Sequence, residues 1–103
     1  MGTVRTLPSY YSPISFEKIT VSTSSIPFTT IPSTPICRAV MVTVETDQVR
    51  FRVDGSAPDS TTGHLLNVGD ILMLENVTMI ANFRVIRVTT DATIQVSYFG
   101  GGV

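Results

Sequence analysis

Apolar and polar side chains alternate most clearly in the second half of the chain. Over residues 49–53, valine and phenylalanine alternate with arginine, and the turn residues Asp54-Gly55 follow at once. This alternation is typical of an antiparallel strand with one buried face. Asp-Gly favours a tight turn because glycine adopts positive φ without steric cost, and Pro58 lacks the N–H that a returning central strand would need. The pattern predicts a small all-β domain.

The same reasoning predicts further short strands, separated by turns every 8 to 12 residues. No stretch shows helical periodicity or helix caps. We therefore expect an all-β fold, a single antiparallel β-sandwich of jelly-roll or immunoglobulin-like type with an extended N-terminal arm. Its parts are an arm over 1–36, a core over 37–99 and a flexible tail over 100–103. The predicted strands cover residues 14–21, 38–45, 48–53, 63–66, 71–75, 79–88 and 93–99.

The first 36 residues differ from the rest in composition. They hold five of the six prolines, at positions 8, 13, 27, 32 and 35, together with many serines and threonines. Prolines this close exclude a helix and a regular ladder, which leaves an extended path. Within the arm, the apolar positions of 14–21 change face, which predicts a bulge near Glu17-Lys18. The arm is too apolar for a solvated linker, so it lies either on its own sandwich or on a neighbouring subunit.

Composition narrows the class of protein. The 103 residues suffice for one core, and charged residues make up 15% of them, below the ~25% of typical soluble domains. Mean hydropathy is +0.30. A surface partly covered by other subunits would have this composition, and so would a threonine-rich sandwich with a neutral surface.

Charge and hydropathy argue against several partners. The net charge of −1 leaves no basic excess to neutralise phosphates, so we expect no nucleic-acid partner. No apolar run approaches the ~20 residues of a membrane span, and no signal peptide is expected. The single cysteine, Cys37, excludes an internal disulfide and is expected to be a small buried side chain.

Residues with catalytic or metal-binding chemistry are few. His64 has no second histidine and no nucleophile motif around it, so we expect a turn or strand-start histidine and no enzymatic activity. Asp54 and Asp59 flank the Gly55–Pro58 loop, but their spacing matches no calcium motif. We interpret Asp54 as a turn former whose side chain bonds the backbone two residues on. No cofactor and no metal is expected.

The candidate interface residues fall into two groups. Arg50 and Arg52 share one face of a strand, and arginine is enriched at protein interfaces. The alternative is a solvated face with local carboxylate partners such as Glu45 and Asp47. The other candidates are apolar or aromatic residues of the arm: Tyr10, Tyr11, Ile26, Phe28 and Ile31.

Several stretches together resemble a family of small proteins from the structural gene clusters of tailed bacteriophages. The shared pattern is a strand ending in Arg-hydrophobic-Asp-Gly-x-x-Pro, a Gly-x-hydrophobic loop, and a final Thr-x-hydrophobic-x-Tyr-Phe strand. It covers roughly the last half of the chain. The matching stretches are residues 50–58, 63–66, Gly69-Asp70, 80–87 and 91–99.

The resemblance implies a virion component without catalytic residues. More specifically, it implies a capsid decoration or cement protein that binds the major capsid protein or other virion proteins. It implies assembly as a homo-oligomer, with a trimer as one form, made in the bacterial host cytoplasm. Two alternatives to a decoration protein remain. One is a tail, neck or baseplate component, and the other is a carbohydrate- or receptor-binding module. The absence of tryptophan argues against the last of these. The Asp-Gly-Ser-x-Pro turn also occurs in immunoglobulin-like sandwiches, an analogy that bears on fold alone.

Overall fold

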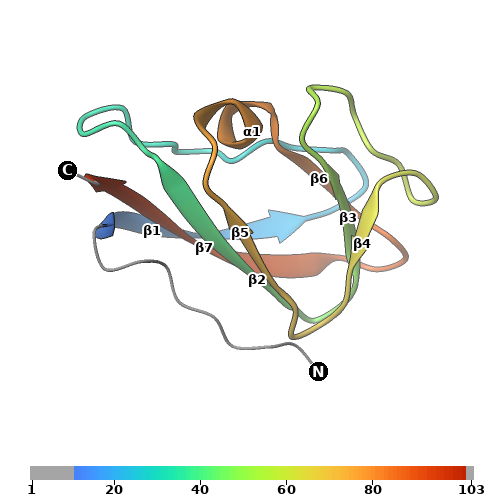
Figure 1. The fold of residues 1–103 in the computed structure, drawn as a ribbon. Helices are drawn as coiled ribbons and strands as arrows, with labels where there is room; N and C mark the ends of the chain where they lie inside the picture. The colour runs from blue at the N-terminus through green and yellow to red at the C-terminus, as the bar shows by residue number, and fades with distance from the viewer. Residues whose placement is uncertain (1–10, 102–103) are drawn as a thin grey trace.

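The computed structural model describes residues 11–101 and shows a mostly β fold with two antiparallel sheets (Figure 1). The four-stranded sheet has the order β1-β7-β2-β5, and the three-stranded sheet has the order β4-β3-β6. The strands are β1 (Tyr11–Val21), β2 (Ala39–Glu45), β3 (Val49–Arg52), β4 (His64–Leu66), β5 (Ile71–Leu74), β6 (Arg84–Arg87) and β7 (Ala92–Gly101), and α1 (Val77–Asn82) precedes β6.

The strands that alternation predicted are present, and their apolar positions point inward. Val40, Val42 and Val44 on β2 are buried while the residues between them are half-exposed. Val49 and Phe51 are buried on β3, with Arg50 and Arg52 on the opposite face. This agreement arises because side chains on a strand alternate between its two faces with a period of two.

The strand expected over residues 79–88 is wrong in its first half. Residues 77–82 form helix α1, and β6 begins only at Arg84. The Asn76 side chain caps the helix by accepting hydrogen bonds from the N–H groups of Thr78 (2.9 Å) and Met79 (3.1 Å). Ile80 is buried in the core, so tertiary packing supports a helix too short to be stable alone.

Strand β1 starts earlier than expected and its bulge lies elsewhere. β1 pairs with β7 from Tyr11 to Val21, and the register shifts between Pro13 and Ser15, not near Glu17-Lys18. Ile14 lies at this shift and is the extra residue of the bulge. The bulge accounts for the change of face that the apolar positions of 14–21 show. The 14–21 segment that was assigned to the arm is thus part of an edge strand of the four-stranded sheet.

The flexible tail expected over 100–103 is wrong for its first two residues, and residues 102–103 lie outside the described part of the chain. Gly100 and Gly101 belong to β7 and pair with Ser12 and Tyr11. A Cβ on Gly100 would lie 2.6 Å from Ile14 Cδ1 and 2.9 Å from the carbonyl oxygen of Ile36. The glycine is therefore required by close packing, which composition alone could not distinguish from a linker.

The Asp54 turn is confirmed. Its carboxylate accepts a hydrogen bond from the N–H of Ser56 at 3.3 Å, and Gly55 has φ +87°. The sequence pattern of an alternating strand followed by Asp-Gly therefore predicted both the strand end and the turn geometry.

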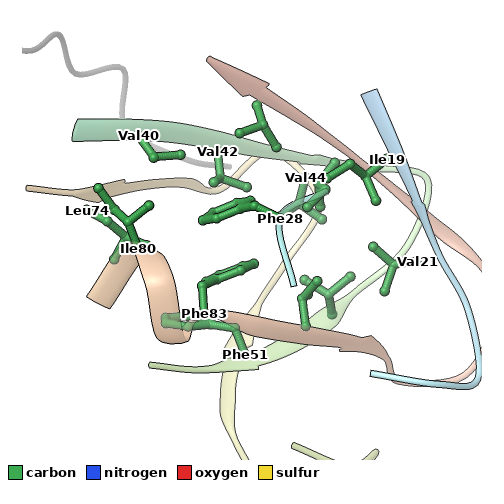
Figure 2. Close-up of a cluster of buried hydrophobic side chains, with 14 of the residues drawn as sticks. Ile19, Val21, Phe28, Val40, Val42, Val44, Phe51, Leu74, Ile80 and Phe83 are labelled. Atoms are coloured by element: carbon green, nitrogen blue, oxygen red, sulfur yellow. The ribbon is translucent and has the colours of Figure 1, made fainter. Parts of the chain in front are cut away.

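A single core cluster joins the two sheets (Figure 2). Phe28 stacks on Phe83 with ring centroids 4.1 Å apart and meets the ring of Tyr98 edge-on at 5.8 Å. Phe83 in turn lies 5.8 Å from Phe51 of the three-stranded sheet. The buried side chains come from β1, β2, β3, β5, β6, β7, α1 and the segment after β1, and none of those in residues 11–100 is charged.

Candidate interaction surfaces

The segment after β1 packs on its own chain for part of its length. Ile26 forms a bridge with Val85 of β6, with N–H to carbonyl distances of 2.9 Å in both directions. Phe28 is 4% exposed within the core. We expect Ile26 and Phe28 at an intersubunit contact from the sequence, but in the structure both pack within one chain. The reason is that the extended backbone at Ile26 pairs with Val85 of β6 and so holds the segment against the core.

Glu17 of β1 links the segment after β1 to the four-stranded sheet by hydrogen bonds. Its carboxylate accepts hydrogen bonds from the hydroxyls of Thr29, Thr30 and Tyr98 and from the N–H of Thr30 (3.1 Å). Partial burial raises the pKa of Glu17, but these hydrogen bonds outweigh it and leave the pKa below its ordinary value. Burial, reinforced by Glu17, raises the pKa of Tyr98 far above its ordinary value, so its hydroxyl stays protonated and donates.

The other expected arm residues divide by position. Tyr10 lies outside the described residues, and Tyr11 is the first residue of β1. Ile31 is 37% exposed and lies beside α1, where it lines an apolar groove. Of the five arm candidates, Ile31 is therefore the one whose described side chain reaches an open apolar surface.

Residues 31–37 and helix α1 lie at the end of the molecule where β2 begins (Figure 1), and side chains of both line this apolar groove. It has a volume of about 230 Å³. On its rim Ile36 is 53% exposed and Val77 is 49% exposed, while Cys37 and Ile80 are buried in its lining. Exposed aliphatic side chains gathered around a groove are typical of an interaction site rather than of a solvated surface.

Arg50 and Arg52 have local partners, though not the expected Glu45 and Asp47. Arg50 donates to the carbonyl oxygens of Ser60 (3.1 Å) and Gly63 (2.9 Å). Arg52 forms an ion pair with Asp54 at 2.5 Å. Both guanidinium groups therefore brace the loop between β3 and β4, which explains their presence without a partner protein.

The outer face of the four-stranded sheet carries few charges. We define it by the residues that alternate with the buried ones: Phe16, Lys18 and Thr20 on β1, Thr93, Gln95, Ser97 and Phe99 on β7, Met41, Thr43 and Glu45 on β2, and Ile71 and Met73 on β5. Phe16 is 60% exposed. Sequence reasoning missed this face because it depends on pairings between segments far apart in the chain.

The residues with reactive chemistry are scattered. His64 lies against the ring of Phe51, with centroids 5.3 Å apart. The Cys37 thiol donates to the carbonyl oxygen of Ala39, and burial raises its pKa. Within residues 11–101, no three side chains of His, Cys, Asp or Glu form a group that could hold a metal ion.

A second, open hollow of about 370 Å³ lies near Asp59, Arg87 and Thr89. The described residues that line it include no aromatic ring.

No helix within the described part of the chain has the length and apolarity needed to cross a membrane. Comparison of the chain with models of protein families, with curated proteins and with solved structures finds no significant match.

Proposed function

We propose that this chain is a virion structural protein of a tailed bacteriophage, a capsid decoration or cement protein that binds and stabilises the head shell. The resemblance of residues 50–99 to small phage structural proteins supports this proposal. The low share of charged residues also supports this proposal, because a surface that is buried against other subunits needs fewer charged side chains than a solvated one. In this proposal it acts on the virion as a homo-oligomer, and its partner is the major capsid protein or another virion protein.

We further propose that the two sheets form a β-sandwich of jelly-roll or immunoglobulin-like type. The shared core supports this class, because apolar side chains of β2 and β7 in one sheet and of β3 and β6 in the other belong to one cluster. Such a scaffold is rigid and leaves its loops and outer faces available for contacts.

The observation that carries the functional proposal is the apolar groove beside α1. Ile31, Ile36 and Val77 expose large aliphatic side chains that a monomer gains nothing by exposing. An apolar segment of a shell protein that filled the groove would gain about 25 cal/mol per Å² of buried apolar surface, before association costs are subtracted. Repetition over a symmetric shell makes such modest contacts collectively strong.

Binding to particles tests the proposal directly. Purified protein is mixed with phage heads assembled without it, and bound copies are counted after sedimentation. The double variant Ile36→Glu/Val77→Glu is expected to reduce binding at least tenfold, because it places two charges on the groove rim, while both sites are exposed enough to leave the fold intact.

Val68→Glu is the matched control. Val68 is 50% exposed, like the rim residues, but it lies in the turn between β4 and β5, at the other end of β2. The control is expected to bind heads as the unaltered protein does. Heads that take up none of the unaltered protein would contradict the decoration proposal, and binding to tails instead would favour the tail alternative.

A further inference from the structure

We propose that the outer face of the four-stranded sheet is the contact between two copies of this chain. The face consists of the twelve residues defined above, and ten of them are uncharged. Interface centres are depleted in charge and enriched in methionine and aromatic residues, and this face carries Met41, Met73, Phe16 and Phe99.

The strand register places three apolar members of the face, together with the small Ser97, in one row across the sheet. Phe16 on β1 is opposite Ser97 on β7, Ser97 is opposite Met41 on β2, and Met41 is opposite Met73 on β5. The neighbouring row runs from Lys18 through Gln95 and Thr43 to Ile71. The first row is therefore uncharged across the full width of the sheet, and three of its four side chains are apolar.

The two sheets differ sharply in charge. The outer face of the three-stranded sheet holds Arg50, Arg52 and Arg84, each bonded to nearby loop groups. On the four-stranded sheet, the two charges lie at the margins of the face. Lys18 is on edge strand β1, and Glu45 ends β2, where it accepts a hydrogen bond from Gln95 at 3.1 Å. Burying this face therefore leaves few charges to desolvate.

The face is also large enough, and no other element of residues 11–101 covers it. Among residues 11–101, α1 and the three-stranded sheet both lie on the inner side of the four-stranded sheet, where Ile80 and Leu74 meet (Figures 1 and 2). Strands about 4.8 Å apart with about 3.4 Å per residue give a flat area of roughly 500 Å² a side. Two copies would bury roughly 1,000 Å², the lower limit for a specific contact and consistent with a dimer of modest affinity.

A second copy is the occupant because the face is complementary to itself under one two-fold rotation. An axis parallel to the strands, between β7 and β2, places β1 of one copy over β5 of the other. Phe16 then lies on the partner's Met73, a favourable sulfur–aromatic contact, and Lys18 covers the partner's Ile71 with its aliphatic stem. An axis across the strands would instead set each strand on its own copy, so that Phe16 would no longer lie on the partner's Met73.

Pairing through the edge of β1 is the competing geometry, and β1 carries features that oppose it. Pro13 lacks an N–H, the register shift follows it, and Lys18 points outward from the same strand. Prolines, bulges and lysines are the devices that prevent edge-to-edge pairing. The inferred contact is thus face to face, and its two-fold symmetry gives a dimer rather than the trimer considered from the sequence.

The dimer does not depend on the proposed shell binding, because the groove beside α1 lies outside this face. Its test uses the purified full chain without particles, so failure of one proposal leaves the other standing. Sedimentation velocity from low micromolar to submillimolar concentration is expected to show a reversible monomer–dimer equilibrium. A protein that stays monomeric throughout this range overturns the inference.

Charge insertion locates the contact. Phe16→Lys and Ser97→Lys are each expected to weaken the dimer at least tenfold, with circular dichroism spectra unchanged. The matched control is Leu65→Lys, since Leu65 is 42% exposed on β4 in the other sheet. Equal weakening by all three variants, or by none, overturns the assignment to this face.

Disulfide trapping tests the two-fold axis. Within one copy, β7 and β2 separate Phe16 from Met73 by about 14 Å between Cα atoms, well beyond the about 4–7 Å that a disulfide spans. Oxidising a mixture of Phe16→Cys and Met73→Cys copies is therefore expected to give one crosslinked dimer containing both. The native Cys37 is 3% exposed and does not compete. Crosslinking of Phe16→Cys with itself would show either edge pairing or an axis across the strands, and both would overturn the inferred arrangement.

Discussion

Glu17 is the residue at which three parts of the chain meet. Its carboxylate accepts hydrogen bonds from Thr29 and Thr30 in the segment after β1 and from Tyr98 of β7. A glutamate on a strand is usually a solvated residue, and the sequence marked it only as part of a bulge. Its role depends on contacts 12 and 81 residues away, which local pattern does not contain.

The Glu17 hydrogen bonds predict a pH dependence of stability. Because its folded-state pKa lies below the ordinary value of 4.5, its contribution is fully present above that pH and is lost as the pH falls through the lowered pKa. Glu17→Gln is expected to cost about 1 kcal/mol at pH 7 and progressively less in acid.

Urea unfolding of both proteins between pH 7 and pH 3 measures this difference. The exposed Glu75→Gln is the control, and it is expected to change the free energy of unfolding little. If the stability curves of Glu17→Gln and the unaltered protein ran parallel over the whole range, the carboxylate would not be the titrating group.

At the scale of elements, alternation predicted the strands well and missed the helix. β2, β3 and β7 follow the period of two, and their inward residues are those that the pattern indicated. Helix α1 has six residues, too few to establish a period, and its apolar residues suit a strand equally well. The one local sign was Asn76, a preferred N-cap residue, placed directly before the helix.

The cap of α1 provides a prediction at this scale. Asn76→Ala removes the acceptor for the N–H groups of Thr78 and Met79, and it is expected to lower the free energy of unfolding by about 1 kcal/mol. Asn76→Asp keeps an acceptor and is expected to be nearly neutral. Thermal unfolding of the two variants compares them, and equal losses for alanine and aspartate would show that the cap is not what stabilises the helix.

At the scale of the molecule, the sequence did not contain the order of the strands. The row from Phe16 to Met73 exists because β7 pairs with β1 on one side and with β2 on the other. Those pairings decide which apolar residues become neighbours on the surface. The groove beside α1 has the same origin, since residues 31–37 and 77–81 meet only in the folded chain. Individual buried and exposed residues were predictable, but the surfaces that they form were not.

Phe28 tests whether the segment after β1 belongs to the fold of a single copy. Its ring contacts Phe83 and Tyr98, and through them it connects both sheets. Phe28→Ala is expected to cost about 3–5 kcal/mol at any protein concentration. Phe16→Ala, at a 60% exposed site, is expected to cost less than about 0.5 kcal/mol in dilute solution.

Denaturant unfolding at two protein concentrations checks both values. If the cost of Phe28→Ala shrank on dilution of the protein, Phe28 would be acting between copies, and the packing described here within one chain would be wrong.

The central place of β7 has a consequence for how the protein is made. β7 follows the other six described strands in sequence, yet it lies between β1 and β2 and pairs with both. During synthesis β1 and β2 leave the ribosome before their common partner, so the four-stranded sheet closes only after β7 has emerged. Any surface built across this sheet therefore forms only after that point, and nascent copies that have not yet reached β7 have no completed face with which to join.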